Sequence, residues 1–195
     1  MNLPTKITVA RLALIPLMIV AYCLQGLAFW VCAITASIFM IAGFTDFLDG
    51  YIARKYNLVT DLGKFLDPIA DKILVIAGLF FVTYGGYTDF IAPYVAMICS
   101  IIIIAREFII GLLRQLAALK SFVIAADKSG KVKTVVTLSA LTTLLYSPLH
   151  EVIAWLGFAE LILATLLTVW SGALYLYKNR GVFISRDKEE KGGGV

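Results

Sequence analysis

The stretch "DFLDGYIARKYNLVTDLGKFLDPIAD", residues 46–71, carries four aspartates in a chain whose residues are 61% hydrophobic. Asp46 and Asp49 are three residues apart, and Asp67 and Asp71 are four apart, so each pair shares one face of a helix. An ionisable side chain inside a membrane helix costs about 2.5–3.5 kcal/mol on insertion scales, and such residues persist where they face an interior or a water-filled cavity. The stretch therefore predicts a polar chamber.

The composition is that of an integral membrane protein. Only 15% of the 195 residues are charged, and the mean hydropathy is +0.91, outside the range of soluble globular domains. A spanning helix needs about 20 mostly apolar residues. The expected fold is all-α, with one membrane domain over residues 1–180. Its six transmembrane helices are predicted at residues 5–25, 28–54, 66–84, 89–118, 133–147 and 151–177.

Basic residues fall on one side of this six-helix pattern. The connections around residues 25–26, 83–90 and 147–151 contain no Lys or Arg, whereas the other connections and both ends of the chain do. Because cytoplasmic loops retain Lys and Arg, both termini are predicted to be cytoplasmic. Residues 1–12 could form an interfacial helix before the first span. Residues 181–195 are expected to be a flexible cytoplasmic tail.

The four aspartates require neutralisation. A cytoplasmic turn expected at residues 57–63 would let the two pairs meet across a hairpin near the inner surface. Like charges a few ångströms apart oppose one another's ionisation, so a cation must neutralise them or they must share protons. Oxygen ligands without His or Cys select Mg²⁺, Mn²⁺ or Ca²⁺. Enough carboxylates are present for two ions about 3.5–4 Å apart, an arrangement that promotes phosphoryl displacement.

Simpler explanations of the same residues stay open. The aspartates could form a salt-bridge network with basic residues near them in sequence, namely Arg54, Lys55, Lys64 and Lys72. Such a network leaves the shared helix faces unexplained. Gly50 and Gly63 could serve close helix packing. Alternatively, because they lack Cβ, they could let a bulky group approach the backbone beside the metals.

The order Asp46-x-x-Asp49-Gly50-x-x-Ala53-Arg54, followed by Gly63-x-x-x-Asp67-x-x-x-Asp71, resembles the complete signature of the CDP-alcohol phosphotransferase family. The resemblance implies a six-helix membrane enzyme, commonly a homodimer, in which an alcohol displaces CMP from a CDP-linked substrate. It implies two divalent ions, Mg²⁺ or Mn²⁺, held by Asp46, Asp49 and Asp67, with Asp71 as a further metal neighbour and the general base. It also implies a CDP-lipid site lined by Gly50, Ala53, Arg54, Thr60 and Gly63.

Four further stretches extend the resemblance over nearly the whole chain, at residues 2–16, 105–114, 130–134 and 167–177. They favour a bacterial subgroup of the inner (cytoplasmic) membrane whose active site faces the cytoplasm. The implied reaction converts CDP-diacylglycerol and sn-glycerol 3-phosphate to phosphatidylglycerophosphate and CMP in phospholipid biosynthesis.

Basic residues fit an anionic acceptor of this kind. Glycerol 3-phosphate is a dianion, and its site should contain Arg or Lys. Arg106 and Arg114 are eight residues apart, about 80° on the helical wheel, so both can face one cavity. Lys131 and Lys133 begin the next predicted helix, where amide donors also attract phosphate. These four residues are the expected glycerol-phosphate site, although the positive-inside bias explains the lysines without a ligand.

Three other regions carry weaker expectations. Thr8 and Arg11 match the subgroup's N-terminal stretch and could contact substrate phosphates, although membrane anchoring explains them equally well. Tyr175 and Tyr177 are expected in an aromatic belt at the inner membrane boundary. Glu107 could orient basic residues or brace its helix.

Other functions stay open at this point. Inositol phosphate or serine could be the acceptor in a related CDP-alcohol phosphotransferase, and positive charge does not separate inositol phosphate from glycerol 3-phosphate. A cation transporter also uses intramembrane carboxylates. However, the four aspartates fall near the cytoplasmic ends of two helices, and the outer half contains no acidic relay. A non-enzymatic membrane assembly protein would show no metal-dependent release of CMP. No nucleic-acid partner is expected.

Overall fold

The computed structural model describes residues 3–24, 30–55, 61–89, 94–119 and 128–179, and no strand occurs within these ranges. The elements are α1 (Leu3–Cys23), α2 (Val31–Lys55), α3 (Asp61–Tyr84), α4 (Val95–Leu119), α5 (Lys128–Tyr146), the 3₁₀ turn η2 (Ser147–Leu149) and α6 (Glu151–Lys178). The all-α prediction is confirmed for this part of the chain.

Four helices contain segments long and apolar enough to cross a membrane, namely Lys6–Cys23, Val95–Gln115, Gly130–Leu149 and Glu151–Lys178. In α2 the apolar segment is shorter, Val31–Thr45. Among the described residues, α3 contains no segment in either group. These are the helices of a multi-pass membrane protein. Six spans and cytoplasmic termini stay predictions.

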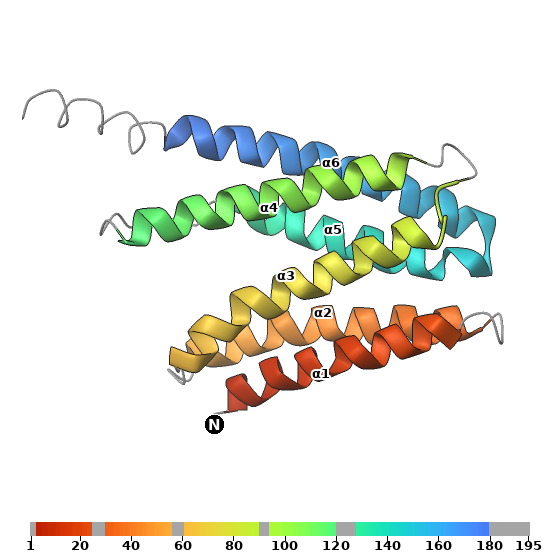
Figure 1. Ribbon diagram of the computed structural model, residues 1–195, viewed down its shortest axis with the longest axis horizontal. Coiled ribbons are helices and arrows are strands. Elements are labelled where there is room, and N and C mark those ends of the chain that lie inside the picture. Colours follow the sequence, from red (N-terminus) through yellow and green to blue (C-terminus); the bar gives the residue numbers. More distant parts are fainter. Residues whose placement is uncertain (1–2, 25–29, 56–60, 90–93, 120–127, 180–195) are drawn as a thin grey trace, which may run out of the picture.

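The helices alternate in direction along the bundle (Figure 1). As a result, the starts of α1, α3 and α5 share one end with the last turns of α2, α4 and α6. We call this the motif end, because it holds residues 46–55 of α2 and 61–71 of α3. In the view of Figure 1, α3 lies between α1 and α2 on one side and α4, α5 and α6 on the other. α5 packs against α2, α3 and α6, while α1 packs against α2 and α3.

All six helices contribute to one apolar core. The side chains Met18, Phe39, Leu79, Ile103, Leu141 and Leu161 are each at most 1% exposed. Large apolar side chains also cover the outside, such as Phe80 and Trp170, both 64% exposed. Apolar residues on both the inside and the outside are expected where lipid replaces water as the solvent, so the packing agrees with the membrane assignment.

Hydroxyl groups add contacts between helices away from the motif end. Ser37 Oγ and Tyr146 Oη are 2.7 Å apart and join α2 to α5. Tyr22 Oη donates to the carbonyl oxygen of Phe81 at 3.0 Å and joins α1 to α3. Hydrogen bonds of this kind between membrane helices contribute about 0.6 kcal/mol each on average. Their contribution to stability is small and adds to that of the apolar packing.

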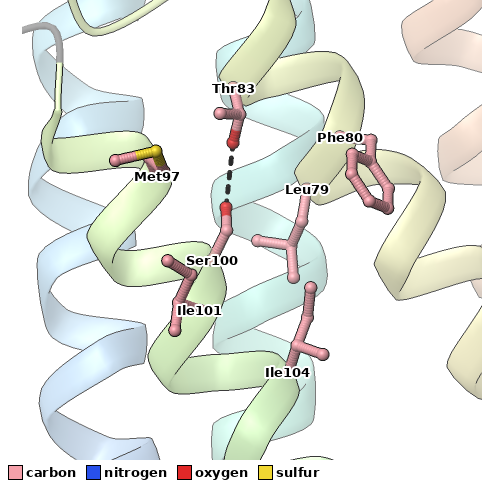
Figure 2. A pocket seen from close by; sticks show the side chains of 7 residues that line it. All are labelled: Leu79, Phe80, Thr83, Met97, Ser100, Ile101 and Ile104. Carbon is pink, nitrogen blue, oxygen red and sulfur yellow. Dashed lines mark hydrogen bonds between the residues drawn. The ribbon is translucent and has the colours of Figure 1, made fainter.

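One recess lies between α3 and α4, on the halves of these helices away from the motif end (Figure 2). Its volume is about 160 Å³, and its polar groups are the hydroxyls of Thr83 and Ser100, which hydrogen-bond to each other at 3.0 Å. The other lining side chains are apolar, namely Leu79, Phe80, Met97, Ile101 and Ile104. Because the two hydroxyls bond to each other and the other lining groups are apolar, this recess presents no group for catalysis or for binding a polar ligand.

Three helix starts differ from the sequence prediction by five or six residues. α3 begins at Asp61 and α5 at Lys128, each five residues early, whereas α4 begins at Val95, six residues late. The turn predicted at residues 57–63 is therefore wrong over 61–63, which are helical, and residues 56–60 lie outside the described part. An acidic residue suits a helix N-terminus, and tertiary packing overrides the low helix propensity of glycine and proline, both present in α3.

The first helix is continuous. α1 runs from Leu3 to Cys23 through Pro16, so residues 3–12 continue directly into the first apolar segment. Thr8 and Arg11 are each 1% exposed and face the bundle. A role of the first turns at the membrane surface stays a prediction.

Packing around Gly78 leaves no room for a side chain. A Cβ atom there would lie 2.7 Å from Cε2 of Phe39 and 3.0 Å from Cδ1 of Leu141. Gly78→Ala is expected to lower the free energy of unfolding by about 1–3 kcal/mol, the usual cost of overpacking. Gly43→Ala is the control, since its Cβ would meet Leu138 at an ordinary 3.5 Å. Thermal unfolding in detergent measures both variants, and wild-type behaviour of Gly78→Ala would contradict this packing.

Candidate functional site

The motif aspartates lie on two consecutive helices at the motif end. Asp46 and Asp49 belong to the last three turns of α2, and Asp67 and Asp71 to the first three turns of α3. Both pairs fall within continuous helix, which is the condition for each pair to share a face. The side chains of Asp46, Asp49 and Asp67 lie outside the described set, so their mutual geometry stays a prediction.

The residues expected at the CDP-lipid site lie on the same two helices, with one exception. Gly50, Ala53 and Arg54 belong to α2, and Gly63 belongs to α3. Thr60 lies outside the described residues. The backbone therefore brings most of the expected CDP-lipid residues to the motif end, and their side-chain roles remain to be tested.

Asp71, whose side chain is described, pairs with a buried cation from the first helix. Arg11 Nη1 donates to Asp71 Oδ1 at 2.8 Å. The Arg11 side chain is fully buried, whereas the Asp71 side chain is 48% exposed. A buried guanidinium needs such a partner because its desolvation is costly. The pair fixes one oxygen of Asp71 against α1, while about half of the Asp71 side chain is exposed.

A second ion pair joins α4 to α5. Lys133 Nζ contacts Glu107 Oε1, and the Lys133 residue is only 4% exposed. The same Glu107 oxygen lies 3.8 Å from Arg106 Nη1. Glu107 therefore contacts two cations and also ties α4 to α5, so the orienting and the bracing role both stay predictions.

Arg106 reaches from α4 to α6. Its Nη2 donates to Ser171 Oγ at 3.1 Å, and its side chain is 14% exposed. Gly172 makes room for the stem, because a Cβ there would lie 3.2 Å from Arg106 Cγ. Ser171 and Gly172 were not singled out from the sequence. The sequence gave no clear signal for them, because α6 contains other small residues, such as Gly157 and Ala164.

The structure separates the four basic residues expected at the glycerol-phosphate site. Arg106 and Lys133 are brought together through Glu107. Arg114 is exposed on α4, within electrostatic range of Arg106. Lys131 is exposed on α5, because two residues along a helix correspond to about 200° of rotation from Lys133. The described contacts therefore link two of the four residues, and Lys131 faces away from both.

The two tyrosines expected in the inner aromatic belt differ in their surroundings. Tyr177 is 66% exposed, as the belt requires. Tyr175 is 5% exposed and faces the bundle, so its assignment to the belt is wrong. Two residues along a helix correspond to about 200° of rotation. Because Tyr177 faces outward, Tyr175 therefore points to nearly the opposite side.

The described residues do not contain a complete metal site. Among the side chains that the structure describes, no three His, Cys, Asp or Glu groups lie close enough to hold a metal ion. Three of the four motif aspartates fall outside that set. The sequence offers only carboxylates at these positions, which fits Mg²⁺ or Mn²⁺ and does not fit a thiolate or imidazole metal.

Comparison with known proteins assigns the chain to a family. The family model for CDP-alcohol phosphatidyltransferase matches residues 1–170. The chain belongs to this family. In this CDP-alcohol phosphatidyltransferase, the matched part includes the motif aspartates and the two ion pairs. Ser171, Gly172 and Tyr175 lie just beyond the matched part.

Individual relatives are similar over most of their length. The CDP-diacylglycerol–glycerol-3-phosphate 3-phosphatidyltransferase of Sodalis glossinidius is 38% identical over 183 residues, which cover 92% of this chain and 96% of that protein. The enzyme of the same name from Salmonella choleraesuis is 39% identical with the same coverage. The cardiolipin synthase (CMP-forming) of Oryza sativa is 35% identical over 91% of this chain and 57% of that protein.

The ion pair between Arg11 and Asp71 can be measured by a double-mutant cycle with Arg11→Met and Asp71→Asn. We expect a coupling free energy of about 1–2 kcal/mol, because a hydrogen bond to a charged group contributes about 1.5–3 kcal/mol and solvent screens the exposed carboxylate. Thermal unfolding in detergent provides the four stabilities. The same cycle with exposed Lys6→Met in place of Arg11→Met should give no coupling. Additive effects of Arg11→Met and Asp71→Asn would contradict the pair.

Proposed function

We propose that this family member is a phosphatidylglycerophosphate synthase, which transfers the phosphatidyl group of CDP-diacylglycerol to sn-glycerol 3-phosphate and releases CMP. The observation that carries the proposal is the 38–39% identity to enzymes named for this reaction over 92% of the chain and 96% of their length. The complete aspartate signature and the buried cation pair support it from the residues.

The proposed enzyme is one membrane domain over residues 1–180 with six spans, both termini on the cytoplasmic side and a tail at 181–195. Its active site would face the cytoplasm from a bacterial inner membrane. The one-sided distribution of Lys and Arg supports this orientation. The protein would act as a homodimer, as the family resemblance implies.

Asp46, Asp49 and Asp67 would hold the divalent ions, with Asp71 beside them. Bound Mg²⁺ or Mn²⁺ would supply neutralisation of the charge that develops on the pyrophosphate. Gly50, Ala53, Arg54, Thr60 and Gly63 would line the space taken by the CDP-lipid, since the glycines permit close approach to the backbone.

Asp71 is the proposed general base. It would take the proton from the acceptor hydroxyl as the oxygen forms a bond to the β-phosphorus, and the bond from that phosphorus to the bridging oxygen breaks as CMP departs. The 2.8 Å bond from Arg11 supports this role, because it holds one carboxylate oxygen while the side chain keeps 48% exposure. Arg11 would thus act on Asp71, while a phosphate contact by Thr8 stays a prediction.

The acceptor phosphate would bind to Arg106 and Lys133. Both are largely buried cations, and Glu107 neutralises only part of their combined charge. A preorganised cation pair in a low-dielectric site attracts a dianion strongly. Arg114 would add positive charge from the same helix as Arg106. The positive charge of Lys131 would attract the phosphate from a longer distance.

The name of one relative raises a second candidate acceptor. The 35% identity to a cardiolipin synthase (CMP-forming) raises a lipid alcohol as the alternative nucleophile, an option that the sequence alone did not bring forward. The buried cations favour the small dianion, because a site with two cations matches a phosphate monoester better than a neutral hydroxyl.

The acceptor is tested with purified protein, CDP-diacylglycerol and one acceptor at a time: sn-glycerol 3-phosphate, inositol phosphate, serine or phosphatidylglycerol. We expect phosphatidylglycerophosphate and CMP with glycerol 3-phosphate, and at least about 100-fold lower kcat/KM with serine and phosphatidylglycerol, because two buried cations select a phosphate monoester. Charge does not separate inositol phosphate, so product with inositol phosphate and none with glycerol 3-phosphate would overturn the choice of acceptor. Mass spectrometry of the lipid product is the measurement. Cardiolipin as the main product would overturn the proposal.

Metal dependence is tested on the same assay. Chelation should abolish turnover, and Mg²⁺ or Mn²⁺ should restore it. Asp67→Asn is expected to lower kcat by about 10³-fold or more, since it removes a carboxylate that would hold the ions neutralising the charge developed in the transition state. Asp89→Asn, an exposed carboxylate at the opposite end of α3, is the matched control and should keep wild-type turnover. Full turnover of Asp67→Asn in folded protein would exclude its role.

A further inference from the structure

A carboxyl group lies at the surface of the bundle between α5 and α6, in the half away from the motif end. Glu160 is nine residues after the start of α6 at Glu151, and its side chain is half-buried. At 1.5 Å per residue it lies about 14 Å along the helix from that start. This position is inside the apolar segment Glu151–Lys178, which is long enough to cross a membrane. Glu160 is therefore an ionisable residue at membrane depth.

Two hydroxyl groups of α5 donate to the same oxygen of Glu160. Thr143 Oγ1 is 3.0 Å from Glu160 Oε2, and Ser139 Oγ is 3.2 Å from it. The other carboxyl oxygen, Oε1, makes no hydrogen bond within the described part of the chain, and it is not buried. The carboxyl group is thus held against α5 through one oxygen and presents the other oxygen to the outside.

Exposed apolar side chains surround this carboxyl group. Leu156 and Leu163 lie one turn before and one turn after Glu160 on α6, and they are 57% and 49% exposed. Val135 lies one turn before Ser139 on α5 and is 65% exposed. We call Val135, Ser139, Leu156, Glu160 and Leu163 the carboxyl face. It is an apolar surface with one acidic group near its middle.

The hydrogen bonds to Glu160 suit an ionised carboxylate, which accepts hydrogen bonds and donates none. An ionised carboxylate at membrane depth is costly unless it meets a charged or polar partner. No Lys, Arg or His among the described residues forms an ion pair with Glu160. The cation that would balance its charge is therefore to be sought outside the bundle.

A second copy of this chain does not offer that cation. No Lys or Arg occurs over residues 12–44, 73–105 or 134–177, which include every helical segment in the half away from the motif end. A copy in the same membrane orientation would bring its basic residues to the motif end instead. Charge complementarity therefore favours a different protein as the partner of the carboxyl face.

We propose that the carboxyl face binds a transmembrane helix of another membrane protein that carries a Lys or Arg at the depth of Glu160. Oε1 accepts from that cation, while Ser139 and Thr143 hold Oε2 in place. The small side chain of Ser139 lets the second helix approach closely. Pairing also satisfies the basic residue of the partner, which is as costly in lipid as the carboxylate. This surface is separate from the motif end, so the inference does not depend on the proposed function.

A synthetic transmembrane peptide tests the proposal in vesicles of phosphatidylcholine, a neutral lipid that does not attract Lys by its net charge. The peptide has about 20 Leu and Ala residues and one Lys at the depth of Glu160. Energy transfer from donor-labelled full-length protein to acceptor-labelled peptide measures association. We expect the affinity to be at least about 10-fold higher than for the same peptide with Leu in place of Lys, because polar contacts between membrane helices contribute about this much.

Variants of the protein locate the binding surface. Glu160→Gln removes the charge and keeps an oxygen for the two hydroxyls, so it should fold, keep wild-type turnover and bind the Lys peptide at least about 10-fold more weakly. Ser139→Phe keeps the carboxylate and blocks the face with bulk, and it should weaken binding in the same way. Leu166→Phe is the matched control. It adds bulk at a 63% exposed position of α6, about 120° around the helix from Glu160, and should bind the Lys peptide as the wild type does.

Equal affinity of the wild type for the Lys and Leu peptides would overturn the inference, since a neutral, protonated Glu160 would then need no cation. Unchanged binding of the Lys peptide by Glu160→Gln would overturn it as well. Mixtures of donor-labelled and acceptor-labelled protein without peptide measure self-association. Loss of that self-association in Glu160→Gln would assign the carboxyl face to contacts between copies and exclude the partner helix.

Discussion

A charge removed from water must find an opposite charge, a hydrogen-bond partner or a polar cavity, and this constraint organises the motif end of the bundle. Arg11 is 1% exposed and donates to Asp71, while Lys133 is 4% exposed and contacts Glu107. Arg106 is held between Glu107 and Ser171. Each buried cation therefore has a defined partner on another element or next to it, and none can rotate away without losing that partner.

The same contacts connect helices. Arg11 and Asp71 join α1 to α3, Lys133 and Glu107 join α5 to α4, and the bond from Arg106 to Ser171 joins α4 to α6. Elsewhere the bundle depends on apolar packing and on hydroxyl contacts such as that between Thr83 and Ser100 (Figure 2). Charged contacts are thus separated from the apolar packing. This separation suits a membrane enzyme, because electrostatic catalysis needs polar groups that are fixed before the substrate arrives.

The relatives carry different names: some are glycerol-3-phosphate phosphatidyltransferases, and one is a cardiolipin synthase. We attribute this difference to the selection of the acceptor. The motif on α2 and α3 does not separate them, since it is the signature of the family as a whole. Arg106 and Lys133 lie outside that signature, on α4 and α5, and under the proposed function they are the groups that would bind the acceptor phosphate.

The sequence by itself determined the helical membrane class and six helices, three of whose starts it misplaced by five or six residues, and it singled out the aspartate signature, Arg106 and Lys133. These follow from composition and from spacing along one helix, which are local properties. The tertiary structure decided that Arg11 pairs with Asp71, sixty positions away, that Glu107 bridges two cations, and that Tyr175 turns inward while Lys131 turns outward. Such pairings depend on how each helix is rotated about its axis against its neighbours. That rotation is set by the packing of all the helices together, so no single segment encodes it.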